Sequence, residues 1–196
     1  MIAVVDYGAG NVTSVRRAFE HLGHEAVVTS EAADVAAADR VVVPGVGHFR
    51  ATATLAGLPL GAAVAAQLAR GTPLLGICLG MQWLFAASSE APEFAGLGAY
   101  AGRCEPLPVA VKTPHVGWDE LQIEPGSCLL AGLPSGTSMY FAHSYCAPLV
   151  AETAAVCDYG VPFSAAVERD RLFGVQFHPE KSGQAGLAIL HNFCRC

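Results

Sequence analysis

The chain has 196 residues, of which 53% are hydrophobic and only 14% are charged. That composition excludes an intrinsically disordered protein, and the length predicts a single domain over residues 1–196. The net charge of −6, without any Lys/Arg-rich run, argues against nucleic acid or an anionic membrane as a partner.

The cysteine count and the N-terminus indicate the compartment. Seven cysteines form no CxxC pair and no zinc-like spacing, so we expect no native disulfide, no metal and no cofactor. The start of the chain lacks the basic region of a signal peptide, and no apolar run is long enough to span a bilayer. A reducing cytoplasm is the simplest interpretation.

Short apolar runs alternate with helical patterns in the first half of the chain. Asn11 can cap a helix in which Val12, Val15, Phe19 and Leu22 recur at helical spacing. The other elements expected there are strands at Ile2–Val5, Glu25–Thr29, Val41–Val43 and Thr72–Ile77, and helices at Gly61–Arg70 and Leu79–Ala87. Uniformly apolar strands between helices predict an α/β fold with an open, mostly parallel twisted sheet covered on both faces.

The second half has a different character. Residues 100–136 are rich in Pro and Gly, which indicates loops and antiparallel additions to the sheet. Later strands are expected at Met139–Ala142, Ala154–Cys157, Ala165–Glu168 and Leu172–Phe177, before a closing helix over Ser182–Cys194.

Gly76-Ile-Cys78-Leu-Gly80 lies where a predicted strand runs into a predicted helix. This is the nucleophile-elbow pattern, in which small residues flank a nucleophile on a sharp turn. The N-terminus of the following helix favours a thiolate, and the amide of Leu79 can donate to an oxyanion. A buried structural cysteine in a tight turn explains this motif equally well.

Gln176-Phe-His178-Pro-Glu180 follows the last predicted strand. In extended backbone, residues two apart point the same way, so His178 and Glu180 can face one site. A carboxylate that accepts one imidazole N–H leaves the other ring nitrogen free to take a thiol proton. Taken alone, the motif is more simply a polar turn.

The two motifs gain weight together, because both follow strands whose carboxyl ends meet at one edge of a parallel sheet. Pro44-Gly-Val-Gly47 follows another strand at that edge. Its glycines permit unusual dihedrals, so it can supply a second oxyanion amide from Val46 or Gly47. An ordinary strand-to-helix turn remains the alternative for this loop.

Seven segments, in order along the whole chain, resemble the class I (triad-type) glutamine amidotransferases, which are flavodoxin-like, and within them the glutaminase subunits of imidazole glycerol phosphate synthase. They are VDYGAGN (5–11), VPGVGHF (43–49), GICLGMQ (76–82), PHVGW (114–118), YFAHSY (140–145), GVQFHPEKSG (174–183) and HNF (191–193).

That resemblance implies hydrolysis of glutamine by a triad of Cys78, His178 and Glu180, and delivery of the ammonia to a (β/α)₈-barrel cyclase. The implied substrate contacts are Gln82, Glu90, Gly47, His143, Ser144 and Tyr145. The implied partner interface contains Asn11, Trp118 and Lys181. The match at Glu90 is loose, and Cys146 departs from the aromatic or basic residue more usual in the family.

Two other classes of function fit parts of the pattern. A related peptidase-like cysteine hydrolase usually lacks the His-x-Glu pair near the C-terminus, so Glu180 counts against it. A non-catalytic binding protein on the same fold would be expected to lose Cys, His or Glu, and none is lost here.

Overall fold

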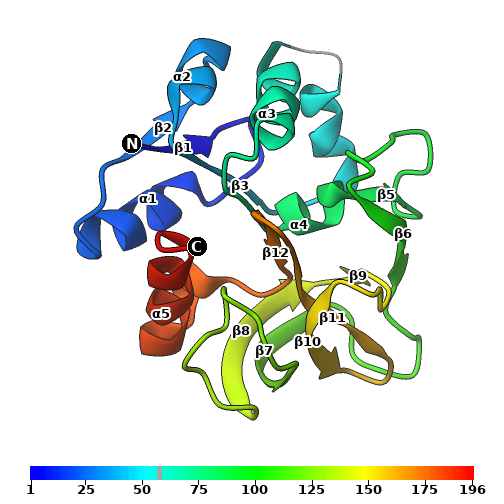
Figure 1. Ribbon diagram of the computed structural model, residues 1–196. Coiled ribbons are helices and arrows are strands. Elements are labelled where there is room, and N and C mark those ends of the chain that lie inside the picture. Colours follow the sequence, from blue (N-terminus) through cyan, green and yellow to red (C-terminus); the bar gives the residue numbers. More distant parts are fainter. Residues whose placement is uncertain (57–58) are drawn as a thin grey trace.

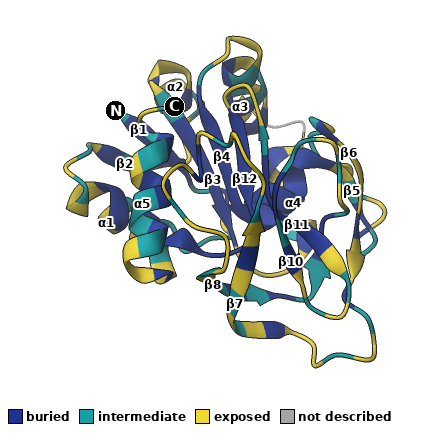
Figure 2. Ribbon diagram, turned by 60° about the horizontal axis from the view of Figure 1, so that its bottom comes forward, coloured by how far each residue is buried: buried dark blue, intermediate teal, exposed yellow. Residues whose placement is uncertain are grey.

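A nine-stranded mixed sheet crosses the molecule in the computed structural model, which describes residues 1–56 and 59–196 (Figure 1). Five neighbouring strands are parallel, in the order β2, β1, β3, β4, β12. Their bounds are β1 (Ile2–Val5), β2 (Ala26–Thr29), β3 (Arg40–Gly45), β4 (Leu74–Cys78) and β12 (Leu172–Val175). These are the short apolar runs of the sequence. Figure 2 shows β3, β4 and β12 mostly dark blue at the centre of the molecule, whereas the edge strand β2 is only partly buried.

The sheet continues beyond β12 with antiparallel strands. In spatial order they are β11 (Pro162–Arg169), β10 (Thr153–Asp158), β7 (His115–Ile123) and β8 (Thr137–His143). A separate three-stranded sheet contains β5 (Phe85–Ser88), β6 (Tyr100–Pro106) and β9 (Tyr145–Cys146). The mixed sheet confirms the predicted fold class and its antiparallel additions.

Helices cover both faces of the parallel strands because alternate strand residues point to opposite sides. Ile2 and Val4 pack with α1 (Val12–His21) and α5 (Gly183–Phe193). Ala3 and Val5 pack with α2 (Ala32–Ala37), α3 (Pro59–Ala69) and α4 (Leu79–Leu84). The 3₁₀ helix η1 (Phe49–Leu55) follows β3. In the part of the chain that the structure describes, no single helix is long and apolar enough to cross a membrane. Only η1 and α3 taken together meet those criteria of length and composition, and the two helices are sharply bent relative to each other.

Most observed elements differ from the expected bounds by one to three residues at an end, and two of them end early for a structural reason. The helix expected at Leu79–Ala87 ends at Leu84, because the next residues form β5 and pair with β6. The strand expected at Leu172–Phe177 ends at Val175, and Pro179–Lys181 forms the 3₁₀ turn η2. In the first case tertiary pairing overrides the helix propensity of alanine.

The expectation of seven free thiols is wrong. Cys128 and Cys196 form a disulfide, and the five remaining cysteines are free. The pair is 68 residues apart in sequence, so no local spacing could reveal it. The fold brings α5 back against the turn after β7, where Asn192 Nδ2 donates to the carbonyls of Leu129 and Ala131.

Candidate active site

Cys78 is held in a strained turn between β4 and α4. Its backbone has φ 53° and ψ −108°, a left-handed φ that few non-glycine residues adopt. Both flanking glycines are sterically required. A Cβ on Gly76 would come within 2.8 Å of the Gly80 backbone, and a Cβ on Gly80 would overlap the Val43 carbonyl. The predicted elbow geometry is therefore present, and α4 sits directly on the sheet.

His178 and Glu180 meet next to this turn, as Nδ1 of His178 lies 2.9 Å from Oε1 of Glu180. Both side chains are buried, with exposed fractions of 2% and 0%. The expected extended segment is not what aligns them, since η2 turns Glu180 back under the imidazole. Because the carboxylate accepts the Nδ1 proton, Nε2 is left as the reactive nitrogen, and it has no hydrogen-bond partner among the described residues.

The electrostatics of His178 favour an imidazolium. Burial by itself would lower the pKa of this imidazole, but the nearby Cys78 sulfur and the Glu180 carboxylate raise the pKa to about 10. A base with a raised pKa next to a thiol holds the proton that the thiol gives up. The arrangement can therefore carry nucleophilic chemistry at sulfur.

A cavity of about 250 Å³ opens over the sulfur. Its lining contains every residue expected to contact the substrate: Gly47, Gln82, Glu90, His143, Ser144 and Tyr145, together with Cys78, Leu79, Pro114 and Ala142. The S–H of Cys78 points at the carbonyl of Ala142, 3.8 Å away. The site thus combines a nucleophile with room for one small polar molecule.

The glycine loop after β3 forms one wall of this cavity. Gly45 is paired in register with Cys78, and Gly47 has φ +94°. Glu90 ties the loop down, because its Oε2 accepts the amide N–H of Phe49 at 2.6 Å. The expected oxyanion residues Leu79, Val46 and Gly47 all lie at this edge, the last two exposed. Their roles as donors stay a prediction.

The residues expected at a partner interface lie around Glu180 and Tyr140. Trp118 on β7 is 58% exposed, and its ring centroid lies 6.0 Å from that of Tyr140. The ammonium of Lys181 is 5.7 Å from the same tyrosine ring. Asn11 is half-buried and donates from Nδ2 to Glu180 Oε1 at 3.3 Å. These three residues were grouped only by the resemblance to the family, and the contact between Asn11 and Glu180 was not predicted.

Two further residues near the sulfur were not singled out from the sequence. Gln176 is fully buried, and its Nε2 lies 3.7 Å from Cys78 Sγ. The phenol of Tyr7 is buried without a hydrogen-bond partner among the described residues, and a Cβ on Gly45 would overlap it. Gln176 stands two residues before His178 in the same motif, which was the available signal. For Tyr7 the signal was its place in the VDYGAGN segment (5–11), which resembles the family.

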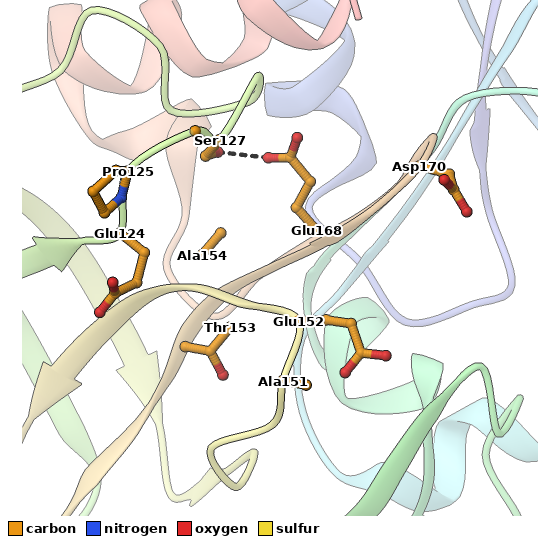
Figure 3. Close-up of a pocket in the computed structure, with 10 residues that line it drawn as sticks. Glu124, Pro125, Ser127, Ala151, Glu152, Thr153, Ala154, Glu168 and Asp170 are labelled. Atoms are coloured by element: carbon orange, nitrogen blue, oxygen red, sulfur yellow. Dashed lines mark hydrogen bonds between the residues drawn. The ribbon is translucent and has the colours of Figure 1, made fainter.

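A second cavity, of about 270 Å³, lies in the antiparallel half and shares no lining residue with the first (Figure 3). Two of its acidic side chains already have partners. Glu168 accepts hydrogen bonds from Ser127 Oγ and from the amides of Cys128 and Leu129, and Glu152 is paired with Arg169. The described residues contain no group of three or more His, Cys, Asp or Glu side chains that could hold a metal. This cavity is a structural feature of the turn that carries Cys128.

An open α/β sheet with a cysteine elbow and a histidine–carboxylate pair at its carboxyl edge is the architecture of a class I glutamine amidotransferase. The family model for glutamine amidotransferase class-I matches residues 3–195. A crystal structure of a glutamine amidotransferase covers 99% of this chain and 100% of its own, with TM-score 0.77 and 18% identity. The structure of PurLQS from Thermotoga maritima covers 99% and 97%, also with TM-score 0.77 and 18% identity.

Sequence relatives narrow the family further. The imidazole glycerol phosphate synthase subunit HisH of Deinococcus radiodurans is 48% identical over 99% of this chain and 93% of its own length. Those of Methanothermobacter thermautotrophicus and Moorella thermoacetica are 46% and 44% identical, over 98% of this chain and 97% and 93% of their own lengths. The chain belongs to the class I glutamine amidotransferase family and, within it, to the HisH subunits.

Proposed function

We propose that this chain hydrolyses L-glutamine to glutamate and ammonia through a thioester on Cys78, as the cytoplasmic glutaminase subunit of imidazole glycerol phosphate synthase. The observation that carries the proposal is the meeting of Cys78, His178 and Glu180 beneath a cavity of about 250 Å³. Loss of any of the three groups would remove nucleophile, base or orienting carboxylate.

The reaction follows from these positions. His178 Nε2 takes the Cys78 proton, and the sulfur attacks the side-chain amide carbon of glutamine. The amides of Leu79 and of Val46 or Gly47 donate to the oxyanion. The imidazolium protonates the leaving nitrogen, so ammonia departs and a glutamyl thioester remains. His178 then takes a proton from water, the hydroxide adds to the thioester, and collapse releases glutamate and Cys78.

The cavity lining suits the α-amino-acid end of glutamine. Both amide hydrogens of Gln82 are committed to other groups, so its oxygen is left to accept from the substrate ammonium. Glu90 adds a negative charge, since its second carboxylate oxygen is not used by Phe49. His143, Ser144 and Tyr145 also line the cavity, and we expect their backbones to contact the substrate.

We infer that ammonia passes to a (β/α)₈-barrel cyclase partner docked over Trp118, Lys181 and Asn11. Ammonia in neutral water is mostly protonated and no longer nucleophilic, so it needs a protected path to its acceptor. The cyclase would form imidazole glycerol phosphate and an aminoimidazole carboxamide ribotide in histidine biosynthesis. Exposed Val116 and Trp118, with exposed fractions of 58% each, give this heterodimer face its apolar area.

The assay measures glutamate release by the chain alone, with the cyclase, and with the cyclase carrying its ribotide ligand. We expect the isolated chain to be nearly idle and the liganded complex to be active, because the Gly45–Gly47 loop can reorient a peptide at low cost. A glutamine-like electrophile should label Cys78 and spare the other cysteines. Full activity of the isolated chain would defeat the coupling, and release of new amino termini from a casein-like peptide would favour a peptidase.

Glu180→Gln separates the roles within the triad. The amide keeps the shape but no longer stabilises the imidazolium, so we expect turnover to fall by about 10³–10⁴ while the fold stays intact. Cys78→Ala should abolish turnover. Near-full turnover of Glu180→Gln in the liganded complex would replace the triad by a Cys–His dyad.

A further inference from the structure

Gln176 lies beside the nucleophile because of strand register. β12 and β4 are parallel, and Val175 is paired with Ile77. The next residue on each strand is therefore Gln176 on one side and Cys78 on the other. Gln176 is fully buried, and Cys78 is 4% exposed. A polar side chain of this size, buried next to a sulfur, has to find partners for its carboxamide.

The orientation of that carboxamide is determined by a short chain of hydrogen bonds. Gln82 Nε2 donates to the backbone carbonyl of Tyr145 at 2.8 Å, and a carbonyl can only accept. The same nitrogen lies 3.1 Å from Gln176 Oε1. Since Gln82 presents its donor side, Gln176 must present its oxygen to Gln82. Its nitrogen is then turned toward Cys78 Sγ, at 3.7 Å.

We propose that Gln176 is a further catalytic residue, whose carboxamide N–H donates to the Cys78 sulfur and stabilises the attacking thiolate. The inference rests on the proposed function for its reaction, but the contact itself concerns only the sulfur. The two neighbours of the sulfur, Ala142 and Gln176, stabilise different protonation states of Cys78. Its carbonyl accepts from the S–H of the neutral thiol, whereas the Gln176 N–H serves the anion. Gln176 therefore favours the nucleophilic thiolate of Cys78, and Ala142 favours the neutral thiol.

The same chain links the nucleophile to the wall of the cavity. The Tyr145 carbonyl accepts from Gln82 and is also 2.9 Å from His143 Nδ1. A movement of this wall would turn Gln82, then Gln176, and so change the donor at the sulfur. Gln82 thereby acts as a positioning residue for Gln176 in addition to lining the cavity.

The test measures the alkylation of Cys78 by iodoacetamide between pH 5 and 10, with the labelled peptide quantified by mass spectrometry. Gln176→Met removes the donor at similar volume, and Gln176→Leu removes it with a branched apolar side chain. For both variants we expect the rate at pH 7 to fall about tenfold and the pH midpoint to rise by about one unit.

The matched control is Gln67→Met. Gln67 is also a buried glutamine, at 2% exposure, but it bonds to the carbonyls of Val35 and Ala38 on the opposite side of the sheet from α1 and α5. The Gln67→Met variant should have a lower melting temperature but the same pH midpoint for the alkylation of Cys78. Thermal unfolding checks that each variant is folded.

Each outcome separates this inference from the proposed function, because alkylation needs no glutamine. A midpoint that stays at the wild-type value in either folded Gln176 variant overturns the inference, even if the chain hydrolyses glutamine. A shifted midpoint in the Gln176 variants supports the contact, whereas a wild-type chain that releases no glutamate even with the liganded cyclase sinks only the proposed function. A shift of the same size in Gln67→Met would show a general loss of packing and also overturn the inference.

Discussion

The disulfide between Cys128 and Cys196 should stabilise the fold mainly through the unfolded chain. It joins residues 68 apart, and closing a loop of that length removes entropy worth about 4.4 kcal/mol at 25 °C in the chain-entropy model. Hydrogen bonds also hold the turn that carries Cys128 in the folded chain. Glu168 holds the Ser127–Leu129 turn by three hydrogen bonds, and Asn192 binds the same turn from α5.

The perturbation is Cys196→Ser, with Cys194→Ser as the matched control. Cys194 lies two residues away, is half-buried and is free. In urea, Cys196→Ser should lose about 2–4 kcal/mol of unfolding free energy relative to the oxidised wild type, and its m-value should rise because the unlinked chain exposes more surface. Wild-type protein treated with a reductant should match the variant.

Thiol titration under denaturing, non-reducing conditions tests the bond directly. We expect five reactive thiols in the wild type. Seven thiols would refute the pairing, and equal urea midpoints for the oxidised wild type and Cys196→Ser would refute the entropic reasoning. An effect of Cys194→Ser as large as that of Cys196→Ser would attribute the loss to packing at the C-terminus.

Two further substitutions test contacts near the sulfur. Gly80→Ala places a methyl group on the Val43 carbonyl, so α4 must move away from the sheet. We expect a loss of several kcal/mol of unfolding free energy and no labelling of Cys78. A stable variant that is fully labelled at Cys78 would contradict the contact. Asn11→Ala removes a hydrogen-bond donor to Glu180, so kcat in the liganded complex should fall about three- to tenfold with an unchanged melting temperature. An unchanged kcat would show that Glu180 does not need the hydrogen bond from Asn11.

Much of the site could be predicted because it depends on local pattern and strand polarity. The apolar run Ile2–Val5 forms a strand with the expected bounds, and the parallel order of β3, β4 and β12 brings their carboxyl ends to one edge. Cys78 and His178 therefore meet across a hundred residues of sequence. Polarity and register together suffice for such a meeting, without any knowledge of side-chain packing.

The remaining features depend on tertiary contacts that have no local signature. Phe85–Ser88 has the composition of a helix end, yet it pairs with β6. Cys128 and Cys196 are brought together only when α5 docks. The contact of Asn11 with Glu180 needs the position of α1 relative to η2. The partners of these residues lie 15 to 169 residues away in the chain, so the local sequence around each residue cannot reveal them.

Stability should fall on mild acidification because of His143. Burial lowers the pKa of this imidazole to about 3, and its Nδ1 proton goes to the Tyr145 carbonyl. Between pH 6.5 and about 3 the unfolded chain binds a proton that the folded chain does not, so stability is lost as the pH falls through this window. From pH 7 to pH 5 the loss from His143 is about 2 kcal/mol.

The opposite shift at His178 does not mask this effect. Its pKa is raised to about 10, so the stability it contributes is complete below pH 6.5 and is lost only as the pH rises toward 10. Urea unfolding at pH 7, 6 and 5 should therefore show a steady decline in the wild type and a flatter profile in His143→Asn, which starts from a lower stability. His24→Asn, at a half-buried position outside the active site, serves as the control for the loss of an imidazole. A His143→Asn profile as steep as that of the wild type would assign the acid sensitivity to other groups, with buried His115, whose pKa burial also lowers, as the first to substitute next.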